Sequence, residues 1–65
     1  MVKMTAKKIK LKRIEKEIST EKLSKMVGIS RVSLYGYESG KKFPRPTIIG
    51  KIAEVLDCEI KDLID

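Results

Sequence analysis

The 65-residue sequence contains no histidine, a single cysteine (Cys58) and only three aromatic residues. Without histidine and with one thiol, the chain lacks the ligands of a structural zinc site, a partner for an intrachain disulfide and the commonest general base of enzymes. No stretch approaches the ~18 apolar residues of a membrane-spanning helix, and no signal-peptide pattern appears. We therefore expect a cytoplasmic protein that is not an enzyme and needs neither a metal nor another cofactor.

The chain is also short, at less than half of the ~150 residues of a typical domain, which predicts one domain over residues 1–65. A chain of this size buries only about 60% of its extended-chain surface, so a deep pocket beside the core is not expected. We accordingly expect no small-molecule ligand. The apolar content of 42% is sufficient for a small core and argues against disorder.

Positive charge is in excess, and it is unevenly distributed. The net charge is +6, but residues 1–46 carry thirteen basic and four acidic side chains, whereas residues 47–65 carry two basic and five acidic ones. A basic surface beside an acidic segment indicates a polyanionic partner that is bound in one orientation. A lysine-rich surface that only keeps the protein soluble is the alternative, and charge alone does not decide between them.

The first expected helix covers residues 4–17, which contain no glycine or proline. Leu11, Ile14 and Ile18 follow one another at i, i+3 and i+7 and suggest the face that packs on the core. Ile9 lies off that stripe, so the sequence leaves the packing face ambiguous.

Capping residues predict the next two helices. Ser19 or Thr20 is the N-cap of a helix that ends at Gly28, since glycine tolerates the positive φ of a helix C-terminus. Ser30 is the N-cap of a third helix that continues to about Glu38. These two helices share a short turn.

A basic loop with two prolines follows, over residues 41–46. Pro46 suits the first position of a fourth helix, where its missing N–H costs nothing. Apolar residues at 48, 49, 52, 53, 55 and 56 give that helix a wide buried stripe. A last short helix holds Ile60, Leu63 and Ile64. The predicted fold class is therefore all-α, a compact domain of five short helices.

Residues 20–38 have the pattern of a helix-turn-helix, in which two helices are joined by a turn that contains glycine. Ser24 stands where the helices approach most closely and a small side chain is needed. The apolar positions that lock the two helices together are Leu23, Val27, Ile29, Leu34 and Tyr37. The alternative is an ordinary pair of helices with no nucleic-acid role, and the basic half of the chain favours the helix-turn-helix.

The run SRVSLYGYESGKKFPRP at residues 30–46 resembles the recognition helix and following loop of the Cro/C1-type (phage repressor-like) helix-turn-helix family. KIAEVLDCEIKDLI at residues 51–64 is similar to the last two helices of that family. The resemblance implies a DNA-binding transcriptional regulator, most often a repressor, that acts as a homodimer on an operator with two-fold symmetry. Double-stranded DNA and a second copy of the chain are then the expected partners.

The resemblance also implies roles for individual residues. The positions that match its base-facing ones are Arg31, Val32, Tyr35 and Gly36. The positions expected to contact the DNA backbone are Thr20, Ser30, Lys41, Lys42 and Arg45. Lys10 and Lys12 are further candidates for phosphate contacts. Gly36 departs from the family, where a long polar side chain is more common, and either allows a close approach of the helix backbone or is merely tolerated.

Four other residues carry separate expectations. Glu38 ends the recognition helix, where its charge opposes the helix dipole, and Arg13 is the best candidate for a structural ion pair with it. A solvated, unpaired Glu38 is the alternative. Glu17 stands where the family has glycine, without threatening the fold. Cys58 is expected to be a buried thiol rather than a redox sensor.

Two other function classes stay open. A protein-interaction or antitoxin-like module uses the same fold, and an unspecific nucleic-acid binder has the same charge. A preference of the protein for one DNA sequence over another would distinguish a regulator from both of these classes. Purely electrostatic binding does not prefer one duplex over another at fixed salt.

Overall fold

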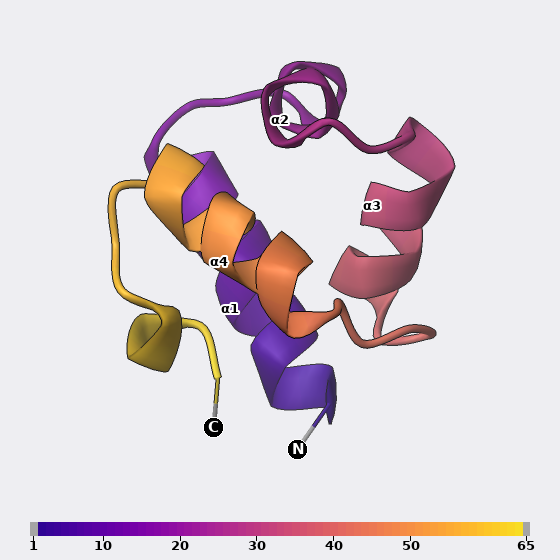
Figure 1. Cartoon of the computed structure of the whole chain (residues 1–65), viewed down its shortest axis with the longest axis vertical. Helices are drawn as coiled ribbons and strands as arrows, with labels where there is room; N and C mark the ends of the chain where they lie inside the picture. The colour runs from indigo at the N-terminus through magenta and orange to yellow at the C-terminus, as the bar shows by residue number, and fades with distance from the viewer. Residues whose placement is uncertain (1, 65) are drawn as a thin grey trace.

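The computed structural model describes residues 2–64 of the chain, with side chains from residue 5 onward. Four α-helices and one 3-10 turn make up this part (Figure 1): α1 (Val2–Glu15), α2 (Thr20–Val27), α3 (Arg31–Ser39), α4 (Pro46–Val55) and η1 (Ile60–Asp62). Over the described residues the all-α class is confirmed. The count of five helices is not confirmed, because the last expected helix is a single turn of three residues.

The short length of η1 has a local cause. The Glu59 N–H donates to Asp62 Oδ2 at 2.9 Å, so a side chain satisfies the backbone donor in front of the turn. Leu63 is fully buried, whereas Ile60 is 43% exposed. With one apolar anchor there is little to stabilise a longer helix.

Serine hydroxyls begin α2 and α3, and glycine ends α2. Ser19 Oγ accepts from the backbone N–H of Lys22 at 3.1 Å, and Ser30 Oγ accepts from that of Ser33 at 3.1 Å. Gly28 has φ 88°, the left-handed conformation expected of a helix C-terminus. The predicted caps at Ser30 and Gly28 are confirmed, and Ser19 is the cap of α2.

The prediction that Pro46 begins the fourth helix, after a loop that contains Pro44, is confirmed. Pro46 is the first residue of α4, and Pro44 is buried. Phe43, between the basic residues of the loop, is about half exposed. The loop is therefore fixed to the core at Pro44 while its neighbours face outward.

The structure decides the packing face of α1, which the sequence left ambiguous, and it is not the side of Leu11 and Ile14. Ile9 is fully buried, whereas Leu11 and Ile14 are 55% and 51% exposed. The buried face runs through Thr5, Ile9 and Arg13 at intervals of four residues, and Arg13 faces inward because its partner lies on α3. One long-range ion pair thus outweighs the local apolar pattern. The helix also starts earlier and ends two residues sooner than residues 4–17.

α1 ends in a turn that places Glu17 at φ 56°. The Glu17 N–H donates to the Ile14 carbonyl at 2.9 Å, and the Ile18 N–H donates to the Arg13 carbonyl at 3.2 Å. Glycine adopts this left-handed conformation freely, whereas other L-residues pay about 1–2 kcal/mol for it. The turn forms with glutamate, at some cost in stability.

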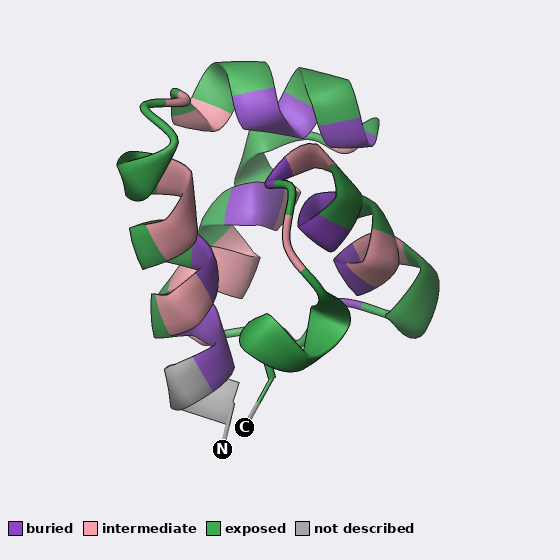
Figure 2. Ribbon diagram, turned by 90° about the vertical axis from the view of Figure 1, so that its left-hand side faces the viewer, coloured by how far each residue is buried: buried purple, intermediate pink, exposed green. Residues whose placement is uncertain are grey.

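One core joins the helices. α2 packs on both α3 and α4, α3 packs on α1, and η1 packs on α4. The buried apolar residues that form the core are Ile9, Leu23, Val27, Leu34, Ile49, Ile52, Ala53, Leu56 and Leu63. Buried positions face the centre of the molecule and exposed ones the outside (Figure 2).

Ser24 is buried between the helices of the helix-turn-helix, as its small size predicts, and its hydroxyl donates to the Glu21 carbonyl at 2.8 Å. Ile29 and Tyr37 pack against the core from partly buried positions. Among residues 5–64, no buried side-chain nitrogen or oxygen lacks a hydrogen-bond partner. None of the helices described is long and apolar enough to cross a membrane.

The strained turn after α1 gives a stability prediction. Glu17→Gly should raise the free energy of unfolding by about 0.5–1 kcal/mol, because the relief of left-handed strain exceeds the extra backbone entropy of glycine. Lys16→Gly is the matched control, since Lys16 does not have a positive φ, and it should lower stability. Urea unfolding measures both. A loss of stability in Glu17→Gly would contradict the strain at this turn.

Candidate nucleic-acid interface

One face of α3 is left in water although it carries large apolar side chains. Val32 is 75% exposed and Tyr35 is 54% exposed, and Arg31 is exposed beside them. Tyr35 follows Arg31 by four positions and Val32 by three, so the three residues share one side of the helix, while Leu34 on the other side is fully buried. Contiguous exposed apolar surface of this kind marks a contact surface. We call it the α3 face: Arg31, Val32, Tyr35, Gly36 and Ser39.

A first hollow lies along the α3 face, on the side of the loop that follows the helix. Its lining residues are Val32, Tyr35, Gly36, Ser39, Lys41 and Lys42. This loop-side hollow joins three of the expected base-contacting residues to two of the expected backbone-contacting lysines.

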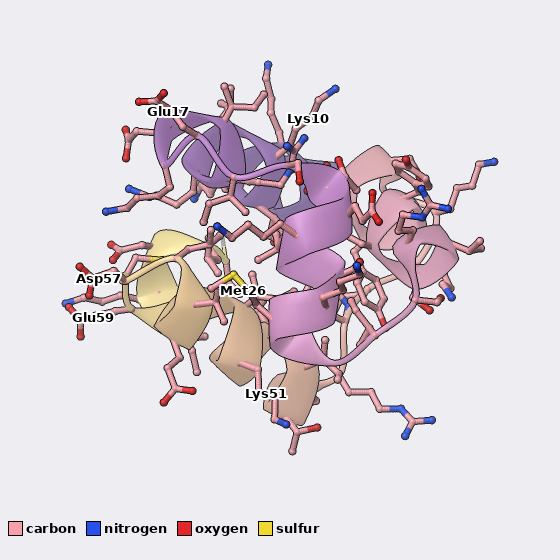
Figure 3. All side chains as sticks on the ribbon, turned by 90° about the horizontal axis from the view of Figure 1, so that it is seen from above. Lys10, Glu17, Met26, Lys51, Asp57 and Glu59 are labelled. Carbon is pink, nitrogen blue, oxygen red and sulfur yellow. The ribbon has the colours of Figure 1, made fainter. Side chains whose placement is uncertain are left out.

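A second hollow lies on the other side of Tyr35, where α1, α2 and α3 meet. Its lining residues are Lys10, Arg13, Thr20, Tyr35, Glu38 and Ser39. Thr20, the first residue of α2, thus shares a hollow with the α3 face, and its helix N-terminus favours an anion. Lys10 projects from α1 at the upper edge of the molecule in Figure 3.

Ser39 lines both hollows, although it was not among the residues expected to contact DNA. Its position, four residues after Tyr35 and three after Gly36, was the available signal. The Ser39 hydroxyl donates to the Gly36 carbonyl at 3.2 Å. Lys10 was only a secondary candidate, and it lines the second hollow together with Tyr35.

Three further residues expected to contact the DNA backbone, Ser30, Arg45 and Lys12, do not line either hollow. Ser30 Oγ accepts from the Ser33 N–H and donates to Ser33 Oγ at 3.1 Å, so the cap already uses this hydroxyl. Arg45 is exposed as the N-cap residue of α4. Lys12 pairs with Glu15 at 3.3 Å and does not line either hollow.

Arg13 and Glu38 meet beneath the second hollow. Arg13 Nε donates to Glu38 Oε2 at 2.8 Å, and Arg13 Nη2 donates to Glu38 Oε1 at 3.3 Å. Arg13 Nη1 donates to the Ile18 carbonyl at 2.9 Å. The two side chains are only 12% and 7% exposed. This bidentate pair holds the one carboxylate of α3 against α1 and away from the exposed face.

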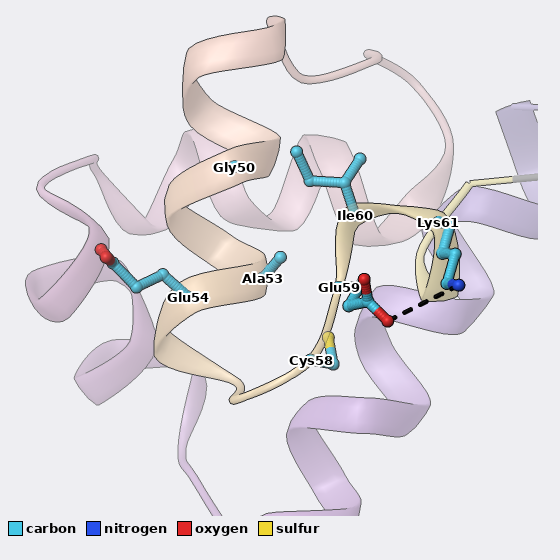
Figure 4. Close-up of a pocket in the computed structure, with 7 residues that line it drawn as sticks. All are labelled: Gly50, Ala53, Glu54, Cys58, Glu59, Ile60 and Lys61. Atoms are coloured by element: carbon cyan, nitrogen blue, oxygen red, sulfur yellow. Dashed lines mark ion pairs between the residues drawn. The ribbon is translucent and has the colours of Figure 1, made fainter.

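The opposite end of the molecule has the opposite charge. Asp57 and Glu59 lie on the side of the molecule away from α3 when it is seen from above (Figure 3). A shallow groove between α4 and η1 is lined there by Gly50, Ala53, Glu54, Cys58, Glu59, Ile60 and Lys61 (Figure 4). Cys58 is half-buried against the core, and burial raises the pKa of its thiol. This thiol is less buried than the sequence predicted.

The fold and the α3 face define a helix-turn-helix domain. A family model described as Helix-turn-helix matches residues 9–63, and the chain belongs to this family, of the Cro/C1 type. The chain is 34% identical over 59 residues to a protein of Sulfolobus acidocaldarius assigned as an HTH-type transcriptional regulatory protein, covering 91% of this chain. It spans about a fifth of the length of the curated relatives it matches.

Two solved structures share the fold over nearly the whole chain. The restriction-modification controller protein C.AhdI from Aeromonas hydrophila is 27% identical, with a TM-score of 0.92 over 97% of this chain and 96% of that one. SinR, a master regulator for biofilm formation whose structure is in complex with DNA, is 28% identical, with a TM-score of 0.89 over 95% of this chain and all of that one.

The buried ion pair gives a second stability prediction. Arg13→Met should lower the free energy of unfolding by about 3–5 kcal/mol, because it leaves the buried Glu38 carboxylate uncompensated. Arg13→Met combined with Glu38→Leu should cost much less, since no charge then stays buried. A double-mutant cycle by urea unfolding measures the coupling, and a coupling near zero would show two independent charges.

Proposed function

We propose that this chain is the DNA-binding domain of a transcription regulator, a repressor that acts in the cytoplasm, with α3 in the major groove of double-stranded DNA. The observation that carries the proposal is the exposed α3 face with cations on both sides: Lys10 at one hollow and Lys41 and Lys42 at the other. Membership of the helix-turn-helix family and the regulators among the relatives support it. In this proposal the domain needs no cofactor and catalyses no reaction.

In this proposal some residues of the domain contact bases and others contact phosphates. Arg31, at the start of α3, has the length and the planar donors to hold guanine O6 and N7 with two hydrogen bonds. Val32 and the ring of Tyr35 offer apolar surface to a thymine methyl. Thr20, Lys41 and Arg45 flank the helix and contact phosphates, which supply affinity and orientation but no sequence information.

We further propose that two copies bind an operator with two-fold symmetry. One nine-residue helix reads only a few base pairs, whereas two copies place two α3 helices about 34 Å apart, one turn of the duplex. The groove of α4 and η1 is lined by Glu54, Glu59 and Lys61, of which Glu59 and Lys61 pair at 3.6 Å. This acidic groove has an excess of one negative charge and disfavours phosphate, so we expect it to be available for contacts between copies. Ile60, 43% exposed at the groove, and the loop before α4 are the expected contact regions.

Selection of duplexes from a random pool tests the readout. The unaltered chain should yield a palindromic consensus. Arg31→Ala should relax the preference at one base position per half-site, since a bidentate pair contributes about 1–3 kcal/mol of discrimination. Lys41→Ala should instead weaken all duplexes alike and lower the salt slope by about one.

The outcomes of the selection separate the functions. If Arg31→Ala weakened every duplex equally, Arg31 would be a phosphate contact. If the unaltered chain bound duplexes without a consensus, the unspecific binder would be correct, and no binding at all would favour a protein-interaction module.

Sedimentation velocity tests the assembly. At micromolar concentration we expect a dimer on a duplex that carries the selected palindrome. Ile60→Glu should reduce dimer formation by placing a further carboxylate in the acidic groove, while Lys51→Ala on α4 serves as a surface control. A monomer both with and without DNA would contradict the two-copy arrangement.

A further inference from the structure

Gly36 stands on the α3 face at a position where the family resemblance implies a long side chain, and another residue fills the space. A Cβ atom added at Gly36 would lie 3.0 Å from Cε of Lys42, 3.7 Å from its Cγ and 3.8 Å from its Cδ. The methylene chain of Lys42 therefore crosses α3 where a side chain at position 36 would begin. An alanine at position 36 would require Cε of Lys42 to move by a few tenths of an ångström, while Cγ and Cδ are at ordinary contact distance.

The backbone brings Lys42 back to this place. The Gly36 carbonyl accepts from the N–H groups of Lys41 at 3.0 Å and Lys42 at 3.2 Å, and also from the Gly40 N–H. Gly40 has φ 83°, and this left-handed residue turns the loop over the last turn of α3. Residue 42 thus starts its side chain beside Gly36.

The far end of the Lys42 side chain has a partner as well. Its Nζ lies 5.6 Å from the centroid of the Tyr37 ring, within the ~6 Å range of a cation–π contact. Tyr37 is half-buried and packs against the core, on the side of α3 away from Val32 and Tyr35. The ammonium therefore lies off the stripe of Val32 and Tyr35, and Lys42 also lines the loop-side hollow.

We propose that Gly36 is a positioning residue for Lys42, so that Lys42 presents its ammonium to one DNA phosphate from a fixed place beside the major groove. The ligand is a phosphate and not a base, because the ammonium lies near the Tyr37 ring and off the stripe of Val32 and Tyr35 that is proposed to enter the groove. This inference rests on the proposed DNA-binding function. It gives Gly36 a role other than the direct base contact that the family resemblance implies.

The physical gain is preorganisation. Lysine has four rotatable side-chain bonds, and fixing them on binding reduces affinity. A lysine that already lies across the helix has less freedom to lose. Gly36 lowers the helix propensity of α3. The contact between Gly36 and Lys42 therefore costs some helix stability, while it restricts the position of the Lys42 ammonium.

The test compares Gly36→Ala, Lys42→Ala and the double variant, using fluorescence anisotropy with a mixed-sequence duplex of about 20 base pairs, two helical turns. Lys42→Ala should weaken binding and lower the salt slope by about one. Gly36→Ala keeps every charge, yet it should weaken binding by about 2- to 10-fold, the effect of one side chain that must be ordered on binding. In the Lys42→Ala background, Gly36→Ala should have no further effect.

A measurement without DNA accompanies the binding assay. The ring of Tyr37 should shift the NMR signals of the Lys42 ε-methylene protons, and Gly36→Ala should change that shift, because the added methyl group displaces Cε of Lys42. Urea unfolding should show that Gly36→Ala is folded, since alanine favours helix. Lys51→Ala removes the same charge from α4 and is the control for net charge.

Each outcome has one meaning. Additive effects of Gly36→Ala and Lys42→Ala on duplex binding would overturn the positioning role, and so would unshifted Lys42 protons in the unaltered protein. Shifted protons together with no binding to any duplex would overturn the proposed function, and the phosphate contact with it, while leaving the Gly36–Lys42 packing in place.

Discussion

The guanidinium of Arg13 connects three parts of the chain that the rest of the structure depends on. It belongs to α1, it binds the carbonyl of Ile18 in the turn before α2, and it holds Glu38 at the end of α3. Arg13 has to face inward to make these contacts, which fixes the rotation of α1 and places Ile9 in the core. A planar, permanently charged group with a fork of donors makes all three bonds at once, and lysine does not.

This constraint bears on function because it governs α3. An unpaired carboxylate at Glu38 would oppose the helix dipole and repel phosphate at the edge of the α3 face. Paired with Arg13, it becomes part of the scaffold, while Lys10, Lys41 and Lys42 line the hollows on the two sides of Tyr35. On its other side α3 is anchored by Leu34 in the core. The helix is thus fixed along one side and open along the other, and the acidic residues around η1 lie at a distance from it.

Much of the fold follows from local rules that the sequence displays. The serine caps, the glycine after α2, the proline at the start of α4 and the apolar positions of the helix-turn-helix were all predictable, because each depends on residues within one or two turns. The packing face of α1 was not, because Leu11 and Ile14 give a misleading stripe and the deciding partner is 25 residues away. The crossing of α3 by Lys42 was not predictable either, since it depends on the conformation of Gly40 and on the missing side chain at Gly36.

In the proposed function, α3, presented by this core, is the surface that meets DNA. An NMR titration of the labelled protein with a duplex tests it most directly, because every backbone amide reports its own surroundings. We expect the largest shifts at residues 31–42 and at Thr20, with small changes across the acidic groove except where two copies meet. Shifts confined to that groove around Gly50 and Ile60, with α3 unchanged, would contradict the account.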